Sequence, residues 1–189
     1  MAGYDSYSFA PDESIIFDKI IKYIVDVVVV ICLGLFVVTY FGVDEKVVGN
    51  SMSPTLLNDQ RIFVDTFTYK LVEPEKEDIV VFNKAVNEGA FGTYVKRIVA
   101  TPGDTVQIKN GKLYINDKIY NTVDDVKIVN AGNISTKMTL DVDEYFVIGD
   151  NINNSEDSRF STIGTVSKEE IVGKVWFIFA PFKNINFVD

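Results

Sequence analysis

Three short clusters hold the residues whose types and spacing could support catalysis, and the chain contains no histidine. The first is the turn-like run GNSMSPTL, residues 49–56. A serine in a turn flanked by glycine and proline can present its Oγ and its own N–H to the same space, as a nucleophile and an oxyanion donor require. Ser51 is therefore a candidate nucleophile, although an ordinary linker could have the same composition. Without histidine, a Ser-His-Asp triad is excluded, and any base must be Lys, Asp, Glu or Tyr.

The second cluster, YVKRIVATPGD at residues 94–104, has the pattern of a β-strand that ends in a Pro-Gly turn. Alternation places Lys96 on the same strand face as Tyr94 and Ile98, and Arg97 on the other face. If the face with Lys96 is buried, desolvation lowers the pKa of its amine from about 10.4 toward the range of about 7–8 that suits a general base. An edge strand with exposed Lys and Arg side chains is the alternative for this cluster taken alone.

The third cluster is GDNINNSEDSR at residues 149–159. Its many Asn, Asp and Ser side chains can bond to nearby backbone groups, which predicts a rigid loop. A calcium loop fits poorly, because the EF-hand spacing and its terminal Glu are missing. The single cysteine, Cys32, lies in an apolar run and excludes an intrachain disulfide or a zinc cluster.

Composition indicates a packed body without a basic surface. The 189 residues suggest one domain, or one domain with an appendage, and an apolar fraction of 47% is too high for a disordered chain. The net charge of −9 argues against nucleic acid as a partner, because phosphate binding needs positive charge.

The N-terminal part contains an uncharged apolar run over residues 27–43, which extends upstream past Asp26 to Tyr23. About 20 apolar residues are enough to cross a bilayer as a helix, so we expect a transmembrane helix over residues 23–43. Lys19 and Lys22 favour a cytoplasmic tail over residues 1–22. Residues 44–189 would then form an extracytoplasmic β-rich domain at the cell membrane.

Residues 44–189 are rich in short β patterns and contain little helical periodicity. Asn110-Gly111 lies between two apolar alternating runs and predicts a type I′ hairpin, with a second turn at Asn116-Asp117. Residues 121–142 are polar and irregular. The expected strands are Arg61–Asp65, Ile79–Phe82, Thr93–Ala100, Val106–Lys109, Leu113–Ile115, Glu144–Ile148 and a closing strand, Val175–Phe179.

Together, the clusters resemble the sequence boxes of bacterial type I signal peptidases of the Gram-positive type, which are membrane-bound proteases with a Ser-Lys dyad. GNSMSPTL is similar to the box of the nucleophilic serine, and KEDIVVF, residues 76–82, to a strand box. YVKRIVATPGD is similar to the lysine box and GDNINNSEDSR to the last box. Their order and spacing agree, so the resemblance covers nearly the whole chain from about residue 20.

The resemblance implies a mainly β fold, with an antiparallel β-sheet catalytic domain of the signal peptidase and LexA type after one transmembrane helix. It implies a serine endopeptidase that removes signal peptides from exported pre-proteins, with no cofactor and no metal. Ser51 would be the nucleophile and Lys96 the general base. The Ser51 N–H would be an oxyanion donor, and Ser155 would orient the Lys96 amine.

Other residues take supporting roles by the same resemblance. Asp157 and Arg159 match a structural ion pair, with Arg97 nearby. Small side chains of an Ala-x-Ala-like cleavage site would enter shallow pockets lined by Met52, Leu56, Tyr94 and Val95.

Three residues depart from the family pattern, and they leave alternatives open. The last box usually has Arg and Asp where this chain has Ile152 and Asn153, and the strand box usually has Gly where this chain has Glu77. A dedicated paralogue that assists pilus assembly or cleaves pre-pilins is therefore an alternative to a general signal peptidase. A LexA-like self-cleaving repressor is another, but the apolar run at residues 27–43 argues against it. The expected partners are pre-proteins or pre-pilins with signal peptides and the lipid bilayer.

Overall fold

The structure, a computed structural model, describes residues 13–87, 90–123 and 125–188. The chain divides into two compact units, with the boundary between Tyr40 and Phe41. The first unit contains the helix α1 (Glu13–Phe41) except its last residue, and the second contains all of the β-strands of the described residues.

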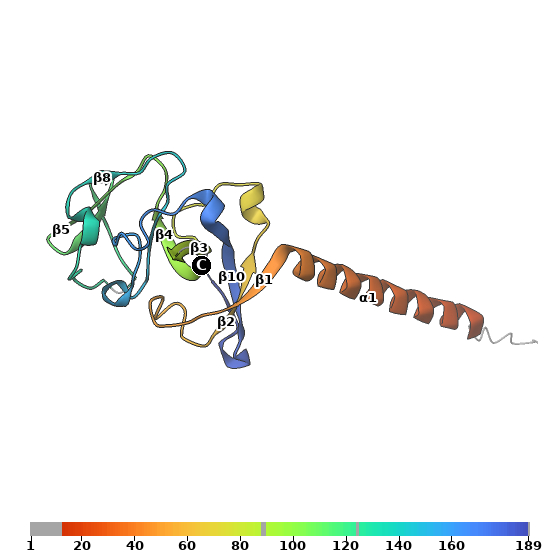
Figure 1. The fold of residues 1–189 in the computed structure, drawn as a ribbon. Helices are drawn as coiled ribbons and strands as arrows, with labels where there is room; N and C mark the ends of the chain where they lie inside the picture. Colours follow the sequence, from red (N-terminus) through yellow and green to blue (C-terminus); the bar gives the residue numbers. More distant parts are fainter. Residues whose placement is uncertain (1–12, 88–89, 124, 189) are drawn as a thin grey trace, which may run out of the picture. The chain divides into compact units, whose positions relative to one another are not determined.

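Helix α1 is one continuous helix of 29 residues (Figure 1). The side chains of residues 16–36 are all exposed, including the large apolar side chains from Ile16 to Phe36. Within the ranges that the structure describes, none of the helices combines the length and the apolar character that crossing a membrane demands. The transmembrane helix over residues 23–43 therefore stays a prediction. Of the expected N-terminal tail, residues 1–12 lie outside the described residues, and Glu13 begins α1.

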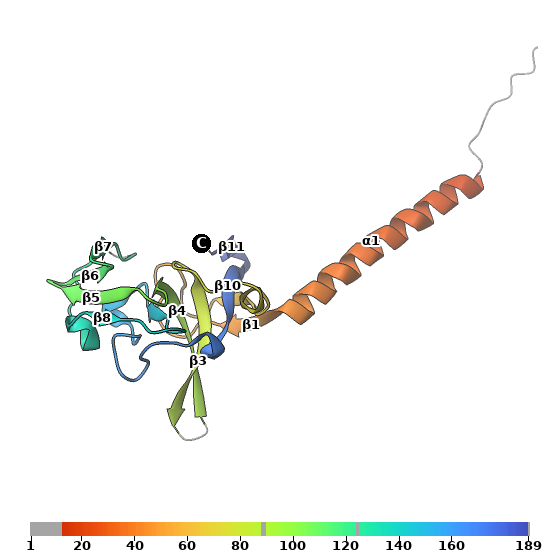
Figure 2. The same ribbon diagram turned by 90° about the horizontal axis from the view of Figure 1, so that it is seen from above.

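The second unit contains one large antiparallel sheet of seven strands (Figures 1 and 2). Their order is β1 (Gly42–Lys46), β2 (Arg61–Asp65), β10 (Ile171–Ala180), β3 (Ile79–Asn87), β4 (Ala90–Ala100) and β9 (Phe146–Ile148), and β11 (Asn186–Phe187) also pairs with β10.

A second, smaller antiparallel sheet carries the predicted hairpin. Its order is β7 (Lys118–Tyr120), β6 (Lys112–Ile115), β5 (Thr105–Lys109) and β8 (Met138–Thr139). The short connecting 3₁₀ helices are η1 (Thr68–Lys70), η2 (Gly132–Ser135), η3 (Ile152–Asn154), η4 (Lys168–Glu170) and η5 (Phe182–Asn184).

The turn predictions for the smaller sheet are confirmed. Asn110 and Gly111 have φ values of 55° and 75°, and they join β5 to β6 in register. Asn116 and Asp117, at φ 52° and 63°, join β6 to β7. Positive φ at both central residues is the requirement of a type I′ turn.

Most strand predictions are confirmed, with longer or shorter bounds. The first expected strand, Arg61–Asp65, matches β2 at both ends, whereas β3 and β4 extend further than expected, and β9 is shorter. The predicted strand at residues 175–179 begins earlier, at Ile171, and lies inside the sheet between β2 and β3. Local sequence does not encode such non-local pairing.

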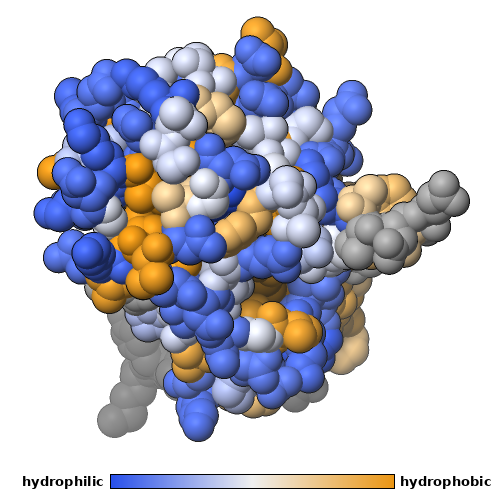
Figure 3. Space-filling model, turned by 60° about the vertical axis from the view of Figure 1, so that its left-hand side comes forward, coloured by the Kyte–Doolittle hydropathy of each residue, from blue (hydrophilic) through white to orange (hydrophobic). Residues whose placement is uncertain are grey.

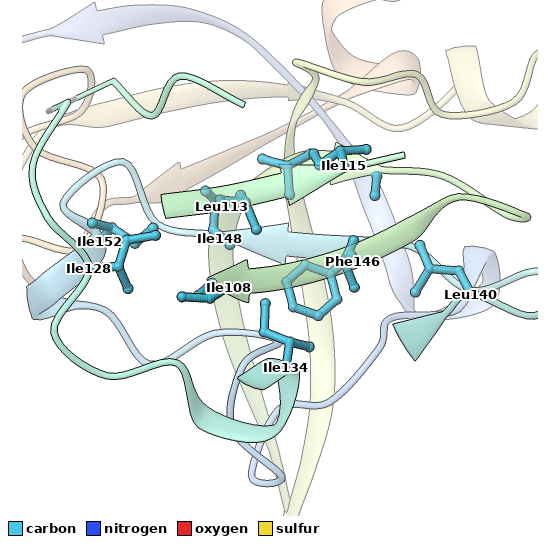
Figure 4. Packing of buried hydrophobic residues seen from close by; sticks show 12 residues of the cluster. Ile108, Leu113, Ile115, Ile128, Ile134, Leu140, Phe146, Ile148 and Ile152 are labelled. Carbon is cyan, nitrogen blue, oxygen red and sulfur yellow. The ribbon is translucent and has the colours of Figure 1, made fainter. Parts of the chain in front are cut away.

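The first four residues of β3, Ile79–Phe82, are apolar without alternation because both faces of the strand are covered there. Ile79 and Val81 pack into one buried cluster with residues of β2, β10 and the segment between β1 and β2, while Val80 and Phe82 pack into another. A third cluster lies under the smaller sheet, where side chains from β5 and β6 meet Phe146 and Ile134 (Figure 4). The face in Figure 3 is largely hydrophilic, with apolar residues reaching the surface in several separate areas.

Replacing Phe146 with alanine tests the third cluster. Phe146 has no exposed surface, so Phe146→Ala should lower the free energy of unfolding by about 3–5 kcal/mol through lost burial and a residual cavity. Urea unfolding followed by the fluorescence of Trp176, the one tryptophan, measures it. Val142→Ala is the matched control, since Val142 is 92% exposed and its loss should cost less than about 0.5 kcal/mol. Equal costs for the two variants would contradict the packing described.

Candidate active site

The predicted pair of Ser51 and Lys96 comes together in the second unit. Lys96 lies on β4, and Ser51 lies in the turn between β1 and β2. Lys96 Nζ is 2.9 Å from Ser51 Oγ and also donates to the backbone oxygen of Val95 at 3.0 Å. A nucleophile and its base need this hydrogen-bond distance.

The Lys96 amine is buried, which is the condition that the sequence sets for its use as a base. Its residue is only 4% exposed, and Ile98 on the same face is fully buried. Burial lowers the pKa of Lys96 to about 8, although the negative charges of Asp157 and Glu156 act in the opposite direction. A cation loses more than a neutral amine when water is removed, so desolvation favours the neutral form. Lys96 is therefore able to accept a proton from Ser51 near pH 8.

The turn that carries Ser51 is held from below and from one side. Met52 and Leu56 are buried beneath it, and the Leu56 N–H donates to the Met52 oxygen at 2.8 Å. From the third cluster, the Asn151 N–H donates to Ser51 O at 3.0 Å, and the Asn151 side chain donates to Asn50 O at 3.1 Å. These contacts fix the backbone on both sides of the serine.

The Ser51 N–H is available as an oxyanion donor. Among the described residues, it donates to no acceptor. Gly49, two residues before Ser51, has a φ of 88° and donates its N–H to Asn58 Oδ1 at 2.8 Å. A donor fixed in place before the reaction stabilises developing charge without reorganisation.

Gly149 permits the close approach of the first and third clusters. A Cβ at this position would lie 2.3 Å from Ser155 Oγ and 2.4 Å from Ser51 O, closer than real atoms come. Ser155 Oγ is therefore beside the Ser51 turn. It is buried and has no hydrogen-bond partner among the described residues, so the expected bond between Ser155 and Lys96 is not present.

The predicted ion pair of Asp157 and Arg159 is present and buried. Arg159 Nε donates to Asp157 Oδ1 at 2.7 Å, and its Nη2 donates to Asp157 Oδ2 at 3.0 Å. Arg159 also donates to the backbone oxygens of Asn130, Ile152 and Ser155. This single side chain therefore orders the loop that carries Ser155.

Arg97 does not join that pair but makes its own with Asp150. Its Nε and Nη2 donate to the two oxygens of Asp150 at 2.8 and 2.9 Å, and Thr55 Oγ1 donates to the same carboxylate at 2.5 Å. Sequence reasoning missed Asp150 and Thr55. A buried arginine next to Lys96 requires a carboxylate partner, but only the fold selects Asp150 from the acidic residues.

A groove of about 230 Å³ leads to the dyad, between the segment Glu45–Val48 and the segment Thr93–Lys96. Of the four residues predicted for the substrate pocket, Met52, Tyr94 and Val95 line this groove. Leu56 does not line it and packs in the core beneath the turn. The Tyr94 ring stacks on Phe82, with 5.6 Å between the ring centroids.

The three departures from the family pattern have structural roles. Ile152 is buried in the cluster under the smaller sheet. Asn153 accepts from the Val129 N–H and donates to Lys127 O, both at 3.0 Å. Glu77 has a φ of 74°, a backbone region that favours glycine, and its carboxylate accepts from the Tyr120 hydroxyl at 2.7 Å.

Gly149→Ala tests whether activity requires the close approach of the first and third clusters at Gly149. The added methyl group should push the Ser51 turn away from Lys96, and displacements of about 1 Å can cost about 100-fold in rate. Peptide cleavage by the purified chain in detergent measures the effect. Gly34→Ala is the control, because a Cβ there meets no atom within 4 Å. An unchanged rate for Gly149→Ala would contradict the described packing of the site.

The chain matches known proteases over most of its length. A family profile described as signal peptidase, peptidase S26, matches residues 20–180. Signal peptidase I P of Bacillus subtilis subsp. natto is 34% identical over 177 residues, which are 89% of this chain and 93% of that protein. Signal peptidase IB of Staphylococcus aureus (strain MRSA252) is 33% identical over 186 residues, covering 89% and 91%.

Among solved structures, a signal peptidase I from Enterococcus faecalis is 25% identical, with a TM-score of 0.42, and covers 55% of this chain and 97% of its own. The profile match over residues 20–180, together with identities above 30% over nearly all of each relative, decides the family. The chain belongs to the S26 family of signal peptidases.

Proposed function

We propose that Ser51 and Lys96 form the catalytic dyad of this type I signal peptidase, and that its substrates are secreted pre-proteins. Membership of the family makes the chain a serine endopeptidase of the signal peptidase I type. The observation that carries the dyad is the 2.9 Å distance between Lys96 Nζ and Ser51 Oγ, with the amine buried at the end of a groove.

Acylation begins with neutral Lys96. The amine takes the proton of the Ser51 hydroxyl while Oγ forms a bond to the carbonyl carbon at the signal-peptide junction. The negative charge on the carbonyl oxygen is stabilised by the Ser51 N–H. Protonated Lys96 then gives its proton to the leaving amine as the peptide bond breaks, and the signal peptide remains as an ester on Ser51.

Deacylation uses the same base. Lys96 takes a proton from water, whose oxygen attacks the ester carbon, and Lys96 returns the proton to Ser51 Oγ as the ester breaks. Ser155 is the proposed orienting partner of the amine during the reaction. Its hydroxyl does not bond to Lys96 in the structure, but it is buried beside the Ser51 turn and is not engaged by another group among the described residues. The buried pairs made by Arg97, Asp157 and Arg159 hold the loops that carry these groups.

The groove is the proposed binding site for the residues before the cleaved bond. Met52, Tyr94 and Val95 offer it shallow apolar walls, which suit the small side chains of an Ala-x-Ala-like sequence. The relatives are named signal peptidase I, which favours general pre-proteins over pre-pilins as substrates. Since Ile152, Asn153 and Glu77 have structural contacts, these departures no longer favour a pilus-dedicated role.

Helix α1 is the proposed membrane anchor, with one crossing that ends at Phe41 and not at residue 43, because Gly42 and Val43 belong to β1. Its 29 residues would extend about 44 Å, against a bilayer core of about 30 Å. The exposed apolar side chains of residues 16–36 support this role, because such a surface is costly in water. Residues 1–22 would then be cytoplasmic and residues 44–189 extracytoplasmic.

The dyad is tested by the pH dependence of cleavage. Only neutral Lys96 accepts a proton, so the single-turnover rate for an Ala-x-Ala peptide should rise with pH through about 8. Lys96→Arg should lose about 100- to 10,000-fold in rate at every pH, as should Lys96→Ala, because a guanidinium stays protonated. Ser51→Ala is the baseline without a nucleophile. A limb near pH 6.5 in the parent, or substantial activity in Lys96→Arg, would contradict Lys96 as the base.

The anchor is tested with the single cysteine, which α1 exposes. In intact spheroplasts, an impermeant maleimide should leave Cys32 unlabelled until detergent is added. In the Cys32→Ser background, Val142→Cys should be labelled from outside, and Ser6→Cys only after permeabilisation. Rapid labelling of Cys32 in intact spheroplasts would contradict a membrane-spanning helix.

A further inference from the structure

Strand β1 presents one unpaired carboxylate. Its other two charged side chains have partners: Asp44 accepts from Arg61 Nε at 3.2 Å, and Lys46 Nζ lies 2.7 Å from Asp59. Glu45 alternates with both of them and shares a strand face with Val47, which is only 3% exposed. Glu45 is half-buried, and within the described part of the chain its carboxylate has no hydrogen bond or ion pair.

This carboxylate lines the groove that leads to the dyad. The two lysines that line the groove already have partners, since Lys46 pairs with Asp59 and Lys96 contacts Ser51. A carboxylate partly removed from water gains from a cationic partner, and none is supplied by the protein. The groove therefore has a net preference for positive charge at Glu45.

The position of Glu45 along the groove limits which substrate residue it meets. Lys96 contacts Ser51, and Val48 is the residue of the other lining segment nearest to Ser51 in sequence. Glu45 and Thr93 are each three residues further from the dyad along their segments. An extended peptide advances about 3.3 Å per residue, so Glu45 lies about 10 Å from the residue next to the cleaved bond. That distance corresponds to the fourth residue before the bond, and a long side chain on the fifth also reaches it.

We propose that Glu45 is a specificity-determining residue that selects pre-proteins with Lys or Arg immediately before the Ala-x-Ala sequence, at the fourth or fifth residue before the cleaved bond. The inference rests on the proposed function, because it requires the residues before the bond to occupy the groove. Glu45 acts on substrate choice and not on the base, since the acidic groups that raise the pKa of Lys96 are Asp157 and Glu156.

The proposal is tested with the full chain in detergent and two sets of matched peptides. One set has Lys, Gln or Glu at the fourth residue before the cleaved bond, and the other has them at the fifth. The parent should cleave the Lys peptide of one set about fivefold faster than the Glu peptide, measured as kcat/KM, the factor of a partly exposed ion pair. Glu45→Gln should abolish this preference, and Glu45→Lys should reverse it. Added salt should weaken the preference, because it screens the ion pair.

Two controls distinguish a failure of the Glu45 proposal from a failure of the proposed function. All variants should cleave the Gln peptides with the same pH limb, which shows that folding and the dyad are intact. Glu169→Gln removes one exposed negative charge outside the groove and should keep the preference for Lys. Equal cleavage of Lys and Glu peptides by the parent, or a preference that survives in Glu45→Gln, would overturn the proposal. Failure to cleave any peptide would instead contradict the proposed function.

Discussion

The removal of one amine from water is the constraint on which the rest of the structure depends. Lys96 is a useful base only while its pKa stays near 8, and burial is what lowers that pKa. Burial in turn requires β4 to lie between β3 and β9 and to have covered side chains on both faces. The order of the strands is therefore part of the chemistry, because an edge position for β4 would leave the amine hydrated and protonated.

Nearby carboxylates raise the pKa of a buried amine, so unpaired negative charges beside Lys96 would oppose the lowering of its pKa by burial. Asp157 does raise the pKa of Lys96, but it is neutralised by Arg159 at 2.7 Å, while Asp150 is paired with Arg97. Each arginine thus has two effects, since it holds a loop in place and offsets a negative charge near the base. This explains why two buried ion pairs accompany a dyad that itself carries little charge.

Sequence alone predicted the parts of the fold that depend on neighbours in the chain. The positive φ values at Asn110-Gly111 follow from turn chemistry, and alternation places Lys96 on one strand face with Ile98, but the burial of that face depends on the neighbouring strands. The placement of β10 between β2 and β3 and the pairing of Arg97 with Asp150 depend on contacts between distant residues, which no local pattern encodes. Leu56 was assigned to the substrate pocket from its motif, yet it supports the turn from inside the core.

The use of lysine in place of histidine couples activity to packing. An imidazole has a pKa near 6.5 in water and can act as a base while exposed, whereas an exposed amine near 10.4 is almost fully protonated at neutral pH. If hydration raised the pKa of Lys96 by one unit, the fraction of neutral Lys96 at a pH below that pKa would fall about tenfold. The fully buried neighbours Ile98 and Val147 therefore serve catalysis without touching the substrate, because they keep water away from the strand that carries the amine.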